Sequence, residues 1–315
     1  MVNVLTMYMS LLRALMKLVG VKPQAVEIEP GTVMRFWVPS DQTTSNTKSK
    51  PDKPAVVFVH GFELDGILTW QFQVLALAKE YAVYVPDLLF FGESITDRKE
   101  RKVAFQAECT AKGLRKLGVE KCTLVGMSYG GVVCFKMAEM YPDLVESMVV
   151  GCTVMAMTES ISRAGLERIG FSSWSEYLMP DTVKGVKDLL LVATYKLPWM
   201  PDFVFKSILE IMFDNRKERL ELLQELVVSD KDFIVPRFSQ KIHLLWGGDD
   251  IIFNMEEARN LKEQLEGKAT LQFIENAGHL VQAERPSAYN KHLKKILASL
   301  HEDGKKKIRV DERKN

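Results

Sequence analysis

One serine lies in a sequence pattern that is typical of a nucleophilic serine. Residues 126–130 read Gly-Met-Ser-Tyr-Gly, with Ser128 at the centre of a G-x-S-x-G pattern. The glycines allow close backbone approach at a strained turn that pushes the serine hydroxyl outward. The apolar run Cys122–Val125 precedes the turn, and apolar residues at helical spacing follow Gly131. A strand, a sharp turn and a helix are therefore predicted.

The chemistry also requires a base, because a serine hydroxyl is a weak nucleophile at neutral pH. His279 follows the last predicted strand, at the edge where sites of open α/β sheets form, and is the candidate base. Asp250 occupies the same place after the preceding strand and is the candidate carboxylate that orients the histidine. Asp249 is the alternative, since adjacent side chains in a turn point in different directions.

The other histidines and the cysteines do not suggest a metal site. His243 lies inside a predicted strand, His292 on a lysine-rich helix and His301 in a charged tail, so all three are expected to be structural or solvent-facing. The cysteines lack C-x-x-C spacing and neighbouring histidines, which predicts reduced, buried thiols, a reducing compartment and no metal. They are Cys109, Cys122, Cys134 and Cys152.

The elements that would position these residues alternate along the chain from Ala55. Short apolar runs separated by helix-length segments predict a mostly parallel sheet with helices on both faces. The predicted strands are Ala55–Val59, Tyr81–Val85, Cys122–Val125, Ser147–Val150, Ile242–Trp246 and Thr270–Ile274, preceded by a hairpin of Val26–Glu29 and Thr32–Val38. The predicted helices are Leu68–Lys79, Lys99–Leu117, Tyr129–Met140, Met255–Glu266 and Pro286–Leu300.

One long segment breaks this alternation. Residues 154–237 contain several helical runs and no convincing strand, which predicts an inserted helical cap between two parts of the core, 21–153 and 238–300. Some of its aromatic residues should line a ligand pocket. The candidates are Phe171, Trp174, Tyr177 and Trp199. Residues 40–54 are expected to form a mobile surface loop, and the charged residues 301–315 a disordered, solvated tail.

The opening of the chain, residues 1–20, predicts an amphipathic helix. Polar residues recur every three or four positions as one stripe, which neither a membrane span nor a cleavable signal peptide should carry. They are Asn3, Thr6, Ser10, Arg13 and Lys17. A helix packed on the protein body is favoured over in-plane contact of residues 1–19 with a membrane. The expected location is the cytoplasm, with peripheral membrane attachment in the second case.

The overall composition is that of an ordinary globular protein. The 315 residues are 47% hydrophobic and 26% charged, enough for a large buried core. The formal net charge is +1, and no basic patch interleaved with aromatic residues occurs in the body of the chain. Nucleic-acid binding is therefore not expected.

Spaced motifs add a resemblance to a known family. His60-Gly61 follows the first parallel strand, Asp87-Leu88 the second, and the sequences GMSYGG, WGGDD and NAGH come later. The chain from about Ala55 to Leu300 thus resembles the α/β-hydrolases, whose order is serine, acid, histidine. Within them it resembles monoacylglycerol-lipase-like and carboxylesterase-like members, and its opening helix and PDLLFFGES stretch resemble plant members. The implied fold is an α/β-hydrolase core with an inserted helical cap.

The resemblance also assigns roles near the serine. It implies that the backbone amides of Phe62 and Tyr129 form an oxyanion hole, and that His60 shapes a loop. Phe90 stands where many relatives have glycine, which predicts a bulkier loop. Glu63 and Asp65 would oppose a developing negative charge if they faced inward, so both are expected to turn to solvent or to pair elsewhere.

The function implied is serine-dependent hydrolysis of a carboxylic ester, without a cofactor. An apolar cap predicts a small apolar ester as substrate. Two alternatives remain: a carbon–carbon bond hydrolase with the same triad, and a non-catalytic small-molecule receptor of the same fold. Epoxide hydrolases and dehalogenases of this fold use a carboxylate nucleophile, and Ser128 argues against both.

Overall fold

A nine-stranded sheet forms the centre of the computed structural model, which describes residues 3–40 and 53–311. Its strands are β1 Val21–Glu29, β2 Thr32–Pro39, β3 Ala55–Val59, β4 Ala82–Pro86, β5 Ile95–Thr96, β6 Cys122–Met127, β7 Val145–Gly151, β10 Lys241–Gly247 and β11 Thr270–Ile274. They lie in the order β1-β2-β4-β3-β6-β7-β10-β11, with β5 paired to β2. The first hairpin is antiparallel, and pairing from β4 to β11 is parallel.

The six predicted parallel strands are confirmed, each within two residues of its predicted bounds. The reason is visible in β6, where all six residues are buried. Parallel strands covered on both faces need continuous apolar runs, and such runs are easy to recognise in a sequence. The predicted hairpin is also confirmed, although β1 begins earlier, at Val21.

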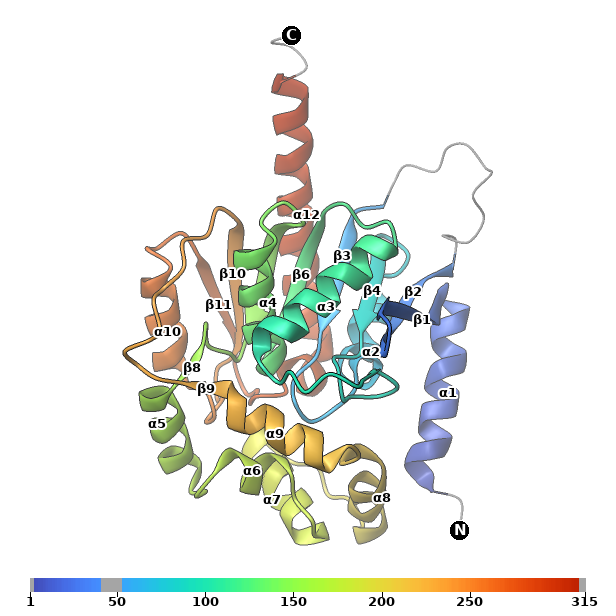
Figure 1. The fold of residues 1–315 in the computed structure, drawn as a ribbon, viewed down its shortest axis with the longest axis vertical. Helices are drawn as coiled ribbons and strands as arrows, with labels where there is room; N and C mark the ends of the chain where they lie inside the picture. The colour runs from blue at the N-terminus through green and yellow to red at the C-terminus, as the bar shows by residue number, and fades with distance from the viewer. Residues whose placement is uncertain (1–2, 41–52, 312–315) are drawn as a thin grey trace.

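Helices cover both faces of the sheet (Figure 1). They are α2 Gly66–Leu77, α3 Val103–Lys116, α4 Tyr129–Met140, α10 Met255–Gln264, α11 Val281–Glu284 and α12 Pro286–Asp311. On one face α3 packs against α4, and on the other α2 packs against α11 and α12. Because each crossover returns the chain to the same edge of the sheet, the loops after β3, β6, β10 and β11 meet there.

Five helices lie together beyond that edge of the sheet (Figure 1). They are α5 Glu159–Ile169, α6 Trp174–Leu178, α7 Val183–Ala193, α8 Asp202–Met212 and α9 Arg216–Leu226. The sequence predicted helices in this segment, but it did not predict two short strands, β8 Met157–Thr158 and β9 Val227–Val228, which pair in parallel. Two-residue strands carry no periodicity, so only the folded chain defines them.

The first helix, α1 Val4–Leu18, begins at Asn3, whose side chain accepts hydrogen bonds from the backbone amides of Leu5 and Thr6. Leu12 and Met16 are buried, and the helix packs against β1, α2 and α8. Other apolar side chains of α1 stay exposed, including Met7, Leu11 and Leu18. The helix is therefore packed on the protein body, as the sequence favoured, but keeps an apolar surface. Within the described ranges, no helix is both long and apolar enough to cross a bilayer.

The last helix corrects one expectation. The sequence predicted a helix ending at Leu300 and a disordered tail, but α12 continues to Asp311 and projects beyond the sheet (Figure 1). Lys, Arg and Glu are good helix formers, and extending an existing helix avoids the cost of nucleation. Residues 312–315 lie outside the described residues, as do 41–52, most of the predicted mobile loop.

Candidate active site

Ser128 lies at the sharp turn between β6 and α4, as the sequence predicted. Its φ of 52° and ψ of −129° are rare for a residue with a side chain, and such strain is typical of a nucleophile turn. A Cβ on Gly130 would lie 2.3 Å from the carbonyl oxygens of Val59 and His60. Glycine is therefore required for α4 to begin this close to β3.

His279 lines the same cavity as Ser128, and it contacts Asp250. Oδ2 of Asp250 lies 2.9 Å from Nδ1 of His279, and both residues are buried. Oδ1 of Asp250 accepts hydrogen bonds from the backbone amides of Ile252, at 2.8 Å, and Phe253, at 3.1 Å. The carboxylate is thus held rigidly, and it can orient the imidazole and stabilise its charged form.

The pKa of His279 is raised above its ordinary value, because the effects that raise it outweigh the one that lowers it. Burial, the largest single cause, would lower the pKa, but the charge and hydrogen bond of the facing Asp250 carboxylate, together with the charges of Glu63 and Glu284, outweigh it. A neutral imidazole with a raised pKa is a better proton acceptor. This is the property that a general base needs.

Asp249 does not face the histidine. Its Oδ2 accepts a hydrogen bond from the backbone amide of Asn276 at 2.9 Å, and so ties together the loops after β10 and β11. The geometry therefore selects Asp250 over Asp249 as the carboxylate beside His279. Adjacent side chains in this turn point in different directions, and the sequence could not say which one turns inward.

Both residues proposed for the oxyanion hole border the same cavity as Ser128. Tyr129 is the first residue of α4, where backbone amides have no carbonyl partner within the helix. The Phe62 and Tyr129 rings pack edge to face, with centroids 5.6 Å apart. Two backbone segments from different loops are thus brought together beside the serine, which is the arrangement that an oxyanion hole requires.

His60 shapes a loop, as expected. Its Nε2 accepts a hydrogen bond from the Leu88 amide at 2.9 Å, and its Nδ1 donates to the Gly61 carbonyl at 2.6 Å. Burial lowers its pKa to about 3. Its ring is therefore neutral and fully engaged, and it ties the loop after β3 to the loop after β4.

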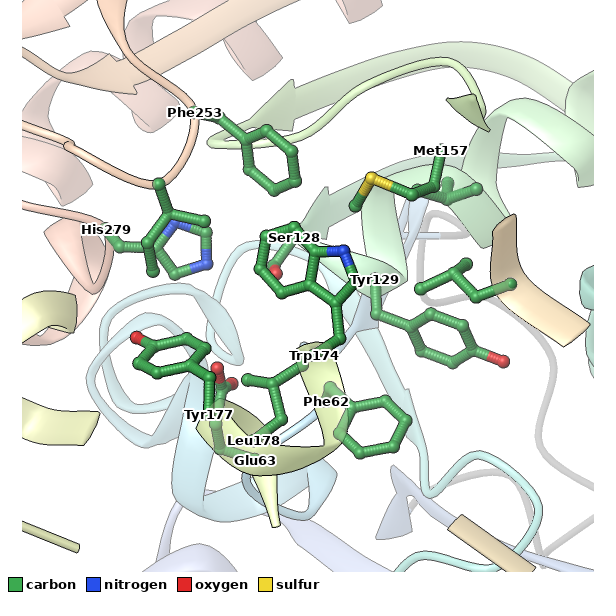
Figure 2. Close-up of a pocket in the computed structure, with 13 residues that line it drawn as sticks. Phe62, Glu63, Ser128, Tyr129, Met157, Trp174, Tyr177, Leu178, Phe253 and His279 are labelled. Atoms are coloured by element: carbon green, nitrogen blue, oxygen red, sulfur yellow. The ribbon is translucent and has the colours of Figure 1, made fainter. Parts of the chain in front are cut away.

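The two acids beside Phe62 behave differently from each other. Asp65 pairs elsewhere, as predicted, because its side chain accepts a hydrogen bond from the Leu68 amide at 2.9 Å and caps α2. The expectation for Glu63 was wrong: it is only 8% exposed and lines the cavity with Ser128 and His279. Figure 2 shows Glu63 among the side chains that line this cavity.

Phe90 lies in the loop after β4 with a φ of 74°, a backbone region that favours glycine. This explains why glycine is common at the position in the family that the sequence resembles. Here the strained carbonyl of Phe90 accepts hydrogen bonds from Arg219 at 3.0 Å and from Asn215 at 3.1 Å. The Arg101 guanidinium lies 4.3 Å from the centre of the Phe90 ring. These contacts hold the bulky residue in place.

The walls of the cavity are mostly apolar (Figure 2). Trp174 and Tyr177, two of the four aromatic candidates, line it. Phe171 instead packs against the Tyr177 ring, and Trp199 is 88% exposed, so neither reaches the cavity. The further apolar lining residues are Val132, Met157, Leu178, Leu226, Ile252 and Phe253.

Cys152, which the sequence indicated only as a buried thiol, lies beside Asp250 and His279, with potential ligand atoms within 4.8 Å of one another. Burial and the Asp250 carboxylate raise the pKa of the thiol well above its usual range. A protonated thiol is a hydrogen-bond donor to a carboxylate and a poor metal ligand. The chemistry of this group therefore fits support of Asp250 better than metal binding.

Comparison with known proteins agrees with this architecture. A family model described as the alpha/beta hydrolase fold matches residues 54–183, which hold the strands from β3 to β7 and the serine turn. This match and the distant relatives described below support an α/β-hydrolase superfamily member. The central sheet and the helices on both its faces agree with that fold.

The individual relatives of this chain are distant. Human epoxide hydrolase 4 is 24% identical over 294 residues, which cover 81% of this chain and 74% of the relative. Monoacylglycerol lipase ABHD6 of Bos taurus is 24% identical over 280 residues, covering 81% and 79%. The crystal structure of a membrane phospholipase A, a bacterial virulence factor, superposes with a TM-score of 0.76 at 22% identity, covering 94% and 91%. These similarities support a hydrolase and leave its reaction open.

Proposed function

We propose that this protein is a serine hydrolase that cleaves a carboxylic ester of an apolar substrate through an acyl-enzyme on Ser128. The observation that carries the proposal is the contact between His279 and Asp250, with His279 lining the same cavity as the strained Ser128. Because Nδ1 of His279 is engaged with Asp250, Nε2 is the ring nitrogen available to the serine hydroxyl.

In the proposed reaction, Oγ of Ser128 attacks the carbonyl carbon of the ester while His279 takes the hydroxyl proton. The amides of Phe62 and Tyr129 stabilise the oxyanion, a contribution of about 3 kcal/mol for each donor. The carbon–oxygen bond then breaks, and His279 gives its proton to the departing alcohol. Water, activated by the same histidine, releases the acid and restores the serine.

The apolar walls support an apolar acyl group as the favoured substrate. The cavity has a volume of only about 30 Å³, room for roughly two water molecules. Side chains such as Trp174 and Tyr177 must therefore move before an ester can bind. One of the relatives is named a monoacylglycerol lipase, which agrees with an acyl ester as substrate.

Hydrolysis of nitrophenyl esters of increasing acyl length by the wild type and by Ser128→Ala tests the proposal. Wild-type turnover should be lost in the variant, and a fluorophosphonate should label only the wild type. Equal rates for two folded proteins would refute the serine mechanism. Slow acylation without turnover would instead favour the receptor alternative, and acid release from a diketone substrate would favour the carbon–carbon hydrolase.

Epoxide hydrolysis is the competing reaction raised by the relatives, because human epoxide hydrolase 4 aligns over most of the chain. That chemistry uses a carboxylate nucleophile in this fold, whereas residue 128 is a serine. An epoxide substrate panel assayed beside the ester panel separates the two, since Ser128-independent opening of an epoxide would contradict the ester assignment.

Peripheral membrane contact through α1 and a cytoplasmic location complete the proposal. The exposed Met7, Leu11 and Leu18 and the neighbouring basic Lys17 support contact with an anionic bilayer. The four cysteines are buried and unpaired, in keeping with a reducing compartment. Co-sedimentation with anionic liposomes, before and after deletion of residues 2–19, measures the contact. Unchanged binding would remove α1 from this role.

A further inference from the structure

The Glu63 carboxylate faces the same cavity as the proposed nucleophile. Glu63, Ser128 and His279 all line that cavity (Figure 2). A Cβ on Gly61 would lie 3.3 Å from Oε2 of Glu63 and 3.4 Å from Cβ of Ser128. The carboxylate and the serine therefore flank the same glycine, which puts Glu63 within reach of a small molecule that reacts at Ser128.

Glu63 is also unpartnered. Among the described residues, none forms a hydrogen bond or an ion pair with its carboxylate, although the residue as a whole is only 8% exposed. Its neighbours in the cavity wall are mainly apolar, including Phe62, Tyr177 and Leu178. A carboxylate in such surroundings has several free acceptor positions, and burying it without a donor is unfavourable. A ligand that brings a donor would remove this penalty.

The position of Glu63 relative to His279 indicates which part of an ester it meets. Glu63 and His279 line the same small cavity, and the Glu63 carboxylate helps to raise the pKa of His279. In the proposed reaction, His279 gives a proton to the departing alcohol, and the alcohol must therefore lie beside His279. An alcohol portion beside His279 would therefore lie in the cavity that Glu63 also lines, while the apolar walls would remain for the acyl portion.

We propose that Glu63 determines substrate specificity by accepting a hydrogen bond from a hydroxyl or ammonium group on the alcohol portion of the ester. The inference rests on the proposed function and narrows it: the substrate class is an apolar acyl ester whose alcohol carries a second polar group with a hydrogen to donate. Such a donor also offsets the Glu63 charge next to the developing oxyanion, which would otherwise slow the reaction.

Three esters of one accepted fatty acid test the inference: the propyl, the hydroxypropyl and the dimethylaminopropyl ester, the last protonated at neutral pH. The wild type should prefer at least one of the two donor-bearing esters to the propyl ester by about tenfold or more in kcat/KM. Glu63→Leu should reduce that preference to less than about threefold. The ester that is preferred tells hydroxyl recognition from ammonium recognition.

A second variant guards against misfolding of the first. Glu63→Gln keeps an acceptor oxygen but loses the charge, so it should retain most of a hydroxypropyl preference and lose a dimethylaminopropyl preference. Glu120→Gln, a change to an exposed carboxylate between α3 and β6, should leave the wild-type ratios unaltered. Thermal unfolding of each variant confirms that it is folded.

Several results would contradict the role inferred for Glu63. Equal wild-type rates for the three esters would overturn it, and so would a wild-type preference that persists in Glu63→Leu. If the wild type prefers the dimethylaminopropyl ester, an unchanged preference in Glu63→Gln would also overturn it. The absence of Ser128-dependent hydrolysis of all three esters overturns the proposed function as well. The two failures are therefore distinguishable.

Discussion

Asp250 binds His279 through one carboxylate oxygen and the loop after β10 through the other, so a single side chain both orients the imidazole and is itself held in place. The contact joins two strand ends that are 29 residues apart in the chain. Its consequences can be measured separately for rate, for pH dependence and for stability.

Asp250→Asn should lower kcat by roughly a thousand- to ten-thousand-fold, because an amide can present its nitrogen to Nδ1 and so favours the wrong tautomer of His279. The matched change is Asp249→Asn, which alters the neighbouring acid that does not face the imidazole. Asp249→Asn should lower kcat by less than about threefold. Steady-state ester hydrolysis measures both, and a larger loss in Asp249→Asn would show that the acids have been assigned the wrong way round.

The pH–rate profile should have an acidic limb set by His279. As the pH falls through the raised pKa of His279, the imidazole becomes charged and can no longer accept the serine proton, so kcat/KM falls. Glu63→Gln removes one of the charges that raise this pKa, and the inflection should move to lower pH. Glu93→Gln, which alters a carboxylate that does not act on His279, should leave the inflection in place.

The raised pKa of His279 also affects the stability of the folded protein. A histidine whose pKa is raised in the folded state stabilises the protein at pH values below its unfolded pKa of 6.5, and the contribution is lost as the pH rises through the folded pKa. His279→Gln should therefore remove a stabilising contribution that is present at low pH. Urea unfolding of both proteins across the acidic range measures the difference, and parallel curves would contradict it.

His60 should have the opposite effect on stability. Its pKa is lowered to about 3 by burial, so below pH 6.5 the unfolded state binds a proton that the folded state excludes. Lowering the pH from 7 to 5 should cost roughly 2 kcal/mol through this residue alone. His60→Gln should be less stable at pH 7 but lose less on acidification. An equal loss in both proteins would argue against a neutral, buried His60.

Gly130→Ala should destabilise the fold by at least about 3 kcal/mol, because the added Cβ meets backbone atoms that cannot move aside. Gly118→Ala is the comparison: its φ of 77° strains an alanine, but no atom lies within 4 Å of the added carbon. It should cost only about 1–2 kcal/mol. Denaturant unfolding compares the two, and similar costs would mean that the turn at Ser128 can widen.

Some features of this protein follow from the sequence itself because their causes are local. The continuous apolar runs predicted the parallel strands, since burial on both faces leaves little choice of residue type. The position of Ser128 between β6 and α4 could be predicted for the same reason: a short apolar run, closely spaced glycines and a helical pattern are adjacent in the chain. The motif order that led to the α/β-hydrolase superfamily is likewise a property of the chain.

Other features were decided only by tertiary structure. Whether Asp249 or Asp250 faces His279 depends on how two distant loops pack, and of the two acids Glu63 and Asp65 only Glu63 lines the cavity. Trp174 and Trp199 look alike in the sequence, yet one lines the cavity and the other is exposed. In each case the side chain's direction is set by contacts between segments far apart in the chain, which no local pattern records.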